Sequence, residues 1–146
     1  MSDDGTLDAF RQKFRVEDLL VYANAHWSWS VRPAQPTLGA GVISLNRYAL
    51  TLAEVTPREM QSLPDVVSRL ERTVRERFDH RIMNYLALMM VDHHVHWHVI
   101  PRYDGTRRFA DRDWHDGGWP GFPVIADAQH GEDGVLETIR DALRVS

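Results

Sequence analysis

His93-His94-Val95-His96-Trp97-His98-Val99-Ile100-Pro101-Arg102 is the stretch that decides the fold of this chain, and it holds four of the chain's eight histidines. Side chains on a β-strand alternate between two faces. On a strand, therefore, three of these histidines project to one side and the apolar residues between them project to the other. The pattern predicts a sheet strand with a chemical face and a core face, and the chemical face would carry His94, His96 and His98.

A metal ion is the first alternative for this row, because imidazole is a common metal ligand. A rise of roughly 3.3 Å per residue places the outer two histidines about 13 Å apart. A Zn–N bond is only about 2.1 Å long, so one ion cannot bind all three on a regular strand. A metal-binding histidine protein would use two of them with a distant carboxylate or histidine. The distant histidines are His26, His80, His115 and His130.

Nucleophilic catalysis at phosphorus is the second alternative, and histidines on the surface of an edge strand are the third. A neutral imidazole nitrogen can attack a phosphate and form a covalent phosphoramidate, which water or another acceptor then resolves. The other ring nitrogen must donate to a fixed acceptor, and neighbouring imidazoles can donate to phosphate oxygens. A triplet on one strand face supplies these groups, and the reaction requires no metal and no other cofactor.

Apolar spacing and turn signals predict both helices and strands in this chain. A short helix is expected over residues 7–14, a turn at residues 24–26 and a Pro- and Gly-rich loop over residues 33–41. Residues 104–123 lack a clear period and are expected to form a loop. The predicted strands are residues 19–22, 27–31, 42–45, 48–52, 82–91 and 94–100.

The clearest helix signal begins at Thr56, which is followed by Pro57 and Glu59. These three residues predict a capping box, in which side chain and backbone satisfy each other's groups at the helix start. Pro64 is expected to kink this helix or to split off its first turns. Its predicted apolar stripe is Met60, Leu63, Val67, Leu70 and Val74, and a C-terminal helix over residues 134–145 would bury Val135, Ile139 and Leu143.

Composition excludes several classes of function. The formal net charge of −4 argues against a broad nucleic-acid surface. The absence of cysteine excludes disulfides, thiolate nucleophiles and Cys-based zinc sites, and it suits a reducing compartment. No apolar run approaches the ~18 residues that span a bilayer, and the acidic, polar start lacks a secretory signal. A cytoplasmic protein without membrane or nucleic-acid partners is expected.

The histidine stretch resembles the signature of the histidine-triad (HIT) superfamily, which is His-φ-His-φ-His-φ-φ with φ hydrophobic. Residues 94–100 fit it at every position. The likeness continues upstream through Leu38-Gly39, Arg47 and residues 52–59, and it covers about residues 25–103. The resemblance implies an α+β fold that has a five-stranded antiparallel sheet with one main helix across it, a C-terminal helix, and commonly a homodimer.

The same resemblance implies a single HIT-like domain over residues 1–146. Its core would span about residues 16–103, followed by a loop and the C-terminal helix in residues 104–146. The activity implied is that of a nucleotide hydrolase or nucleotidyl transferase acting at the α-phosphate, for example of a dinucleoside polyphosphate or a nucleoside phosphoramidate, with an adenine nucleotide expected.

The resemblance also assigns roles to residues of this chain. His96 would be the nucleophile, His98 would bind the α-phosphate, and His94 would support the hydrogen-bond network. The candidate substrate contacts besides His98 are Asn84, ten residues before the triad, Arg102 at the end of the strand, and Ser30 or Arg32 at the ribose position.

This chain departs from the family pattern close to the triad. Met89-Met90-Val91-Asp92-His93 replaces the usual approach, and Tyr48 stands where a histidine is usual. Asp92 is expected to orient a neighbouring histidine. These departures indicate a divergent subgroup near the diadenosine polyphosphate hydrolases. They also leave open a nucleotide-binding or signalling module that has kept the triad and lost efficient catalysis.

Overall fold

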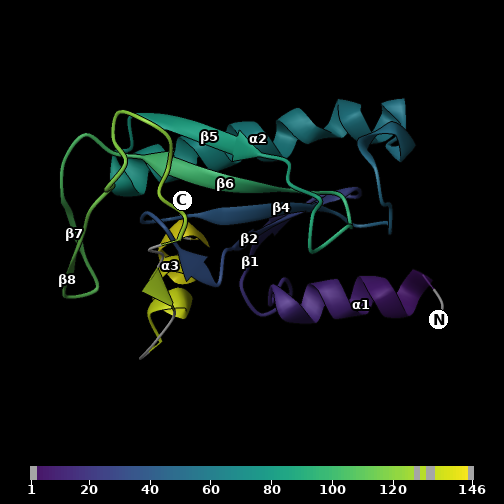
Figure 1. Cartoon of the computed structure of the whole chain (residues 1–146), viewed down its shortest axis with the longest axis horizontal. Helices are drawn as coiled ribbons and strands as arrows, with labels where there is room; N and C mark the ends of the chain where they lie inside the picture. The colour runs from purple at the N-terminus through teal and green to yellow at the C-terminus, as the bar shows by residue number, and fades with distance from the viewer. Residues whose placement is uncertain (1–2, 127–128, 131–133, 145–146) are drawn as a thin grey trace.

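A five-stranded antiparallel sheet forms the centre of the computed structural model, which describes residues 3–126, 129–130 and 134–144. Its strands are β1 (Leu20–Ala23), β2 (Trp27–Val31), β4 (Gly41–Leu45), β5 (Ile82–Leu86) and β6 (His96–Arg102). They lie in the order β1-β2-β4-β6-β5, as Figure 1 shows. The expected α+β fold with five antiparallel strands is confirmed.

Helix α2 (Pro57–Phe78) packs across one face of the sheet. Trp29, Ile43 and Trp97 lie opposite one another in neighbouring strands, so they share that face. They belong to the main core together with Leu70 and Val74 of α2. The apolar residues between the histidines are therefore the core side of β6, as the alternation predicts.

The start of α2 confirms the expected capping box. The backbone N–H of Glu59 donates to the Thr56 hydroxyl at 3.2 Å, and the backbone N–H of Thr56 donates to the Glu59 carboxylate at 2.9 Å. The first turns are not split off at Pro64, because the helix runs unbroken from Pro57 to Phe78, and a kink at Pro64 stays a prediction. The apolar stripe was also misplaced at its start, since Met60 is 44% exposed while Val66 is buried.

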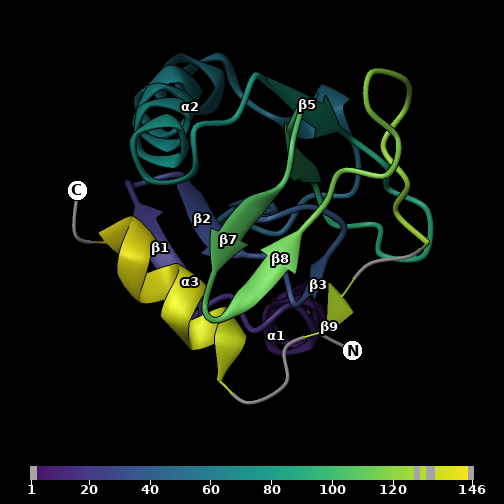
Figure 2. The ribbon, with the colours of Figure 1, turned by 90° about the vertical axis from the view of Figure 1, so that its left-hand side faces the viewer.

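Helix α3 (Val135–Arg144) packs against β1, β2 and α2, as Figure 2 shows beside β1. Val135, Ile139 and Leu143 are buried, which confirms the predicted inner side. The predicted last residue, Val145, lies outside the described residues. None of the helices described is long and apolar enough to cross a membrane.

Two short pairings arise where loops were expected. Strand β3 (Ala34–Gln35) pairs with β9 (Gln129–His130), and β7 (Arg107–Phe109) pairs with β8 (Arg112–Trp114). The turn of the β7–β8 hairpin places Ala110 and Asp111 at positive φ, 52° and 59°. A hairpin turn of this conformation is usually recognised in a sequence by Asn-Gly or Asp-Gly. This chain has Ala110-Asp111 at the turn instead, so the sequence did not predict the hairpin.

The segment between β5 and β6 is irregular, and two predicted strands are therefore too long. Strand β5 ends at Leu86, so the apolar residues up to Val91 are not part of the sheet, and Val91 is 82% exposed. Strand β6 begins at His96, so His94 precedes it. The chain is held there by Val95, whose N–H donates to the Ala49 carbonyl at 2.8 Å and whose carbonyl accepts from Leu45 at 3.2 Å.

Residues 48–52 are not extended as predicted. They turn into a 3-10 helix, η1 (Leu52–Glu54). The Glu54 carboxylate accepts the backbone N–H groups of Leu50 and Thr51 at 2.7 and 2.9 Å. A carboxylate that satisfies local backbone donors competes with strand pairing, so this segment bends.

Helix α1 (Asp3–Lys13) lies on the other side of the sheet from α2, where Figures 1 and 2 both show it beside the strands. It begins before the predicted residues 7–14. Its Phe10, with Phe14 and Val16 just beyond it, forms a small cluster with Val42 of β4, separate from the main core. This second face is the one that carries the histidines.

Candidate functional site

His96 and His98 stand side by side on β6. Their ring centroids are 4.8 Å apart and the rings meet edge to face. His98 lies opposite Val42, and His96 lies opposite Ser44, both on β4. These residues therefore share the face that α1 covers, away from α2.

Hydrogen bonds give each of these two rings one neutral tautomer. His96 Nδ1 lies 2.5 Å from the backbone carbonyl of His94, which can only accept, so Nδ1 carries the proton and Nε2 carries the lone pair. On His98, Nδ1 accepts from Arg32 Nε at 3.1 Å. The proton of His98 is therefore on Nε2, which donates to His96 Nε2 at 3.2 Å.

His94 is fixed from the turn after β4, although it lies outside the strand. Its Nε2 donates to the Leu45 carbonyl at 2.7 Å, and its Nδ1 accepts the backbone N–H of Ala49 at 3.3 Å. The ring of Tyr48 stacks on it, with centroids 5.4 Å apart and planes 11° apart. His94 thus supports the site through its backbone carbonyl and its fixed ring.

Burial keeps all three imidazoles neutral. Burial is the largest cause that lowers the pKa of His94 and of His96. For His98, burial and then the positive charge of Arg32 lower the pKa to about 4. At neutral pH the three rings are therefore uncharged, which is the state that an attacking imidazole needs.

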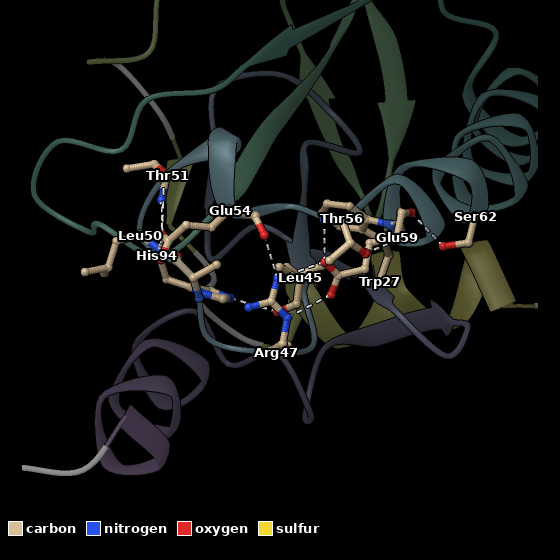
Figure 3. A network of polar contacts seen from close by, with 11 residues as sticks. Trp27, Leu45, Arg47, Leu50, Thr51, Glu54, Thr56, Glu59, Ser62 and His94 are labelled. Atoms are coloured by element: carbon tan, nitrogen blue, oxygen red, sulfur yellow. Dashed lines mark hydrogen bonds and ion pairs between the residues drawn. The ribbon is translucent and has the colours of Figure 1, made fainter.

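An ion pair between Arg47 and Glu59 ties the His94 turn to the start of α2, as Figure 3 shows. Arg47 Nε and Nη2 donate to the two carboxylate oxygens at 3.0 and 2.8 Å. Arg47 and the Thr56 backbone lower the pKa of Glu59 to about 2. Trp27 Nε1 also donates to the Glu59 carbonyl at 2.8 Å. In the sequence, Arg47 stood out only as part of the upstream likeness to the HIT superfamily.

Two phenylalanines of the N-terminal segment cover the triad, and sequence reasoning missed this. The Phe10 centroid lies 4.9 Å from His94 and 5.1 Å from His96. The Phe14 centroid lies 5.7 Å from His96 and 6.1 Å from His98. His96 is only 1% exposed as a result. The sequence predicted a short helix over residues 7–14, but it gave no indication of what that helix covers.

Asp92 does not orient a histidine, contrary to the prediction. Lys13 Nζ lies 2.9 Å from both Asp92 carboxylate oxygens, so Asp92 joins α1 to the segment before β6. Beside this pair lies a groove of ≈ 380 Å³, whose lining includes Tyr48, Leu50 and His94. The groove reaches the triad from its His94 side.

The structure brings two predicted contacts to the triad and joins the other two to each other. Arg32 touches His98, and Ser30 is buried beside Val42 on the same face, with no hydrogen-bond partner for its hydroxyl among the described residues. Asn84 lies opposite Ile100 on β6, but its Oδ1 accepts from Arg102 at 2.8 Å. Arg102 also pairs with Asp116 at 2.7 Å and is buried.

No cluster of three or more His, Asp or Glu side chains able to hold a metal ion occurs in the described part of the chain. The side chain of His130, one of the distant histidines considered for such a site, lies outside that part. The donor atoms of the triad are engaged with the backbone, with Arg32 and with each other.

Residues 39–105 match the family model of the HIT domain, and this range includes the whole histidine strand. No curated protein matches the sequence. The fold is similar to that of solved histidine-triad proteins. A hypothetical histidine triad nucleotide-binding protein from Sulfolobus tokodaii strain 7 is 15% identical, with a TM-score of 0.70 over 97% of this chain and 89% of that one.

Two further solved structures show the same fold. A histidine triad protein from Bradyrhizobium japonicum is 18% identical, with a TM-score of 0.68 over 90% of this chain and 92% of that chain. A Zn-bound histidine triad family protein from Mycobacterium smegmatis is 18% identical, with a TM-score of 0.59 over 87% and 81%. The chain therefore has the HIT fold.

Proposed function

We propose that this chain, with its HIT fold and its HIT-domain match, binds a nucleotide and acts at the α-phosphate as a hydrolase or nucleotidyl transferase. One observation carries the proposal. The Nε2 atom of His96 bears a lone pair in a buried, neutral ring whose Nδ1 proton is held by the His94 carbonyl. This is the state in which imidazole is a nucleophile.

The proposed reaction has two steps. His96 Nε2 gives its lone pair to the α-phosphorus, the bond from phosphorus to the leaving group breaks, and the leaving group departs with that electron pair. The positive charge that develops on the ring is stabilised through Nδ1–H and the His94 carbonyl. In the second step, water or another acceptor attacks phosphorus, the P–N bond breaks, and His96 is restored with the acceptor's proton released.

His98 has a defined part in this scheme. Without a ligand its Nε2–H donates to the lone pair of His96. When that lone pair bonds to phosphorus, the same N–H becomes free to donate to a non-bridging phosphate oxygen. A preorganised donor of this kind stabilises charge as it develops in the transition state.

The charges around the triad suit an anionic ligand. Arg32 lies beside His98, and no ion pair to a carboxylate is found for it in the described residues. We assign Arg32 and Ser30 to the nucleotide side of the site. Asn84 and Arg102 would contact only a group that extends along β6 past Ile100. The proposed unit is a homodimer, which the resemblance to the HIT superfamily implies.

Mass spectrometry tests the proposal with two substrate classes, diadenosine polyphosphates and adenosine phosphoramidate. We expect an adenylyl adduct on His96 that turns over to AMP. Absence of both adduct and AMP with every substrate, in protein that also fails to bind AMP, would reject nucleotide chemistry at this site.

A nucleotide-binding module without turnover is the second candidate, and the cover over His96 favours it. The ring centroids of Phe10 and Phe14 lie 5.1 and 5.7 Å from that of His96, which is only 1% exposed. Tight AMP binding without adduct or product would support the module, whereas a His96 adduct that is hydrolysed supports the enzyme.

A further inference from the structure

Arg32 contacts the triad from the end of β2. It follows Val31, the last residue of that strand, and precedes Pro33. Its Nε donates to His98 Nδ1 at 3.1 Å, while its Nη1 donates to the Ala34 carbonyl at 2.8 Å. The second bond holds the guanidinium in place, so the first has a fixed direction.

This contact selects a tautomer. A neutral imidazole carries its proton on either nitrogen, and the hydrogen bond made by one nitrogen decides the state of the other. Because a guanidinium can only donate, His98 Nδ1 must accept and His98 Nε2 must carry the proton. Only this form can donate toward His96 and, after attack, toward phosphate.

We infer that Arg32 is a positioning residue that acts through His98 by holding it as the Nε2–H tautomer. The inference rests on the proposed function, since the donor it fixes serves the phosphate. Arg32 thus takes a role that the sequence could not assign when it offered this residue as a ribose contact.

Nitrogen-15 NMR of the imidazole rings tests this inference without any substrate. The wild-type chain is expected to show His98 as the Nε2–H tautomer. Arg32→Met should give a mixture of tautomers, and Arg32→Gln, which keeps an N–H donor, should restore part of the wild-type signal. The exposed charge control Arg77→Met should leave the signal unchanged. With a substrate that forms the His96 adduct, Arg32→Met should lower kcat at least about tenfold.

An unchanged His98 tautomer in Arg32→Met would overturn the inference, whatever the activity. A changed His98 tautomer in Arg32→Met, together with no adduct in the wild-type chain, would instead reject the proposed reaction and retain the role of the Arg32 contact. A kcat loss in Arg32→Met that Arg32→Gln does not improve, with the tautomer restored, would also contradict a role through His98.

A second inference concerns helix α1, and different contacts carry it. Its apolar contacts lie apart from the main core: Phe10, Phe14 and Val16 form a separate cluster with Val42. The Lys13–Asp92 ion pair fastens its C-terminal end to the segment before β6. Arg15 follows at a φ of 51° and is anchored to Glu137 of α3 at 2.7 Å.

The surface under this cover is polar. The hydroxyls of Ser30 and Ser44 are buried and have no hydrogen-bond partner among the residues described. Both serines share the histidine face, since Ser30 pairs with Val42 and Ser44 with His96. Buried hydroxyls almost always have a partner, and phenylalanine rings cannot supply one. Phosphate or ribose oxygens can.

We propose that α1 is a lid that swings about residues 14–16 and that a nucleotide binds only when it is open. In the closed state the phenylalanines occupy the place of the phosphate and ribose. Opening exposes His96 Nε2 and the two serine hydroxyls together. Like the first inference, this one rests on the proposed function, although the motion itself can be measured without a nucleotide.

A cleavable cross-link tests the lid, because the chain has no cysteine of its own. In the double variant Lys13→Cys/Asp92→Cys, a disulfide-containing bis-maleimide would join the two cysteines. Mass spectrometry would then measure the rate at which diethyl pyrocarbonate modifies His96. We expect modification at least tenfold slower when linked, and recovery after reduction. Phe10→Ala should be modified faster than wild type. AMP affinity should fall and recover in parallel with the linked and reduced states.

The matched control is Arg108→Cys/Asp113→Cys, an ion pair of 3.3 Å on the β7–β8 hairpin, cross-linked in the same way. It should change neither rate nor affinity. Equal His96 modification in linked and reduced Lys13→Cys/Asp92→Cys protein would overturn the lid. Slower modification in the linked form, with no AMP binding in any form, would retain the lid and reject the nucleotide.

Discussion

The Nε2 atoms of His96 and His98 lie 3.2 Å apart with a single proton between them. His96 can attack only after it loses this hydrogen bond, so the donor must find a new acceptor at the same moment. A phosphate oxygen is such an acceptor. In the proposed reaction, the pair therefore couples the arrival of the ligand to the release of the His96 lone pair.

The first prediction concerns replacement of the proposed nucleophile, His96. His96→Ala should lower turnover by at least about 10³-fold, because no other lone pair is presented to phosphorus. Adduct formation and product release report the loss, and circular dichroism checks the fold. His93→Ala is the control, since this neighbouring histidine is exposed and should retain activity. Near-wild-type turnover by His96→Ala would defeat the mechanism.

The buried imidazoles should make stability fall in mild acid. The pKa of His98 is lowered to about 4, and the pKa values of His94 and His96 are lowered as well. Below the unfolded pKa of about 6.5 the unfolded chain binds more protons than the folded one. The stabilisation is therefore complete above that pH and is lost progressively as the pH falls toward the folded values.

Each such group contributes a slope of about 1.4 kcal/mol per pH unit within its window. Urea unfolding between pH 7 and pH 4 measures it. His98→Gln should flatten the dependence by about one proton. A stability that is independent of pH over this range would contradict the buried, neutral state of the triad.

Glu59 should stabilise the start of α2 mainly through its capping hydrogen bond and less through its ion pair with Arg47. Glu59→Gln should lower the free energy of unfolding by about 1–2 kcal/mol, because the capping bond weakens. The ion pair adds little to this loss, since Arg47 is half exposed and solvent screens its charge. With the pKa of Glu59 lowered to about 2, its contribution is present above pH 4.5 and is lost as the pH falls toward 2. Glu76→Gln, exposed on the same helix, is the control.

Arg102 should prove to be a structural residue. It is buried with Asp116, which it contacts through two nitrogens, and its third bond goes to Asn84. Arg102→Met leaves a buried carboxylate without its partner and should cost about 3–5 kcal/mol of stability. Thermal unfolding and steady-state kinetics separate the roles: an unchanged Tm with a raised KM would assign Arg102 to the substrate instead.

The periodic parts of the fold could be predicted, because a single local pattern determines each. The capping box at Thr56 and the alternation around His96 are satisfied by neighbours in sequence. The end of β5 at Leu86 could not be predicted, since Val91 is as apolar as a strand residue and yet lies in solvent. Backbone hydrogen bonds to Leu45 and Ala49, in a turn distant in sequence, determine the path of the chain before β6.

In the site too, contacts between residues distant in sequence could not be predicted. Three histidines in register predicted a chemical face, and the family resemblance proposed His96 as its nucleophile. Their tautomers depend on Arg32 and on the turn at Ala49, which are far away in sequence. The helix predicted over residues 7–14 did not reveal that Phe10 and Phe14 cover the triad. Arg102 looked like an anion contact because it ends the strand, and only the structure shows its carboxylate partner.

The two phenylalanines over the triad also set a threshold for recognition. Exposing both side chains to water costs about 3–6 kcal/mol, so a ligand that requires an open site binds on the order of 10²- to 10⁴-fold more weakly than its contacts alone would allow. Inorganic phosphate, which gains few contacts, would rarely overcome that penalty. A ligand that also offers ribose and base could do so, and the fold would thereby discriminate by ligand size before any chemistry begins.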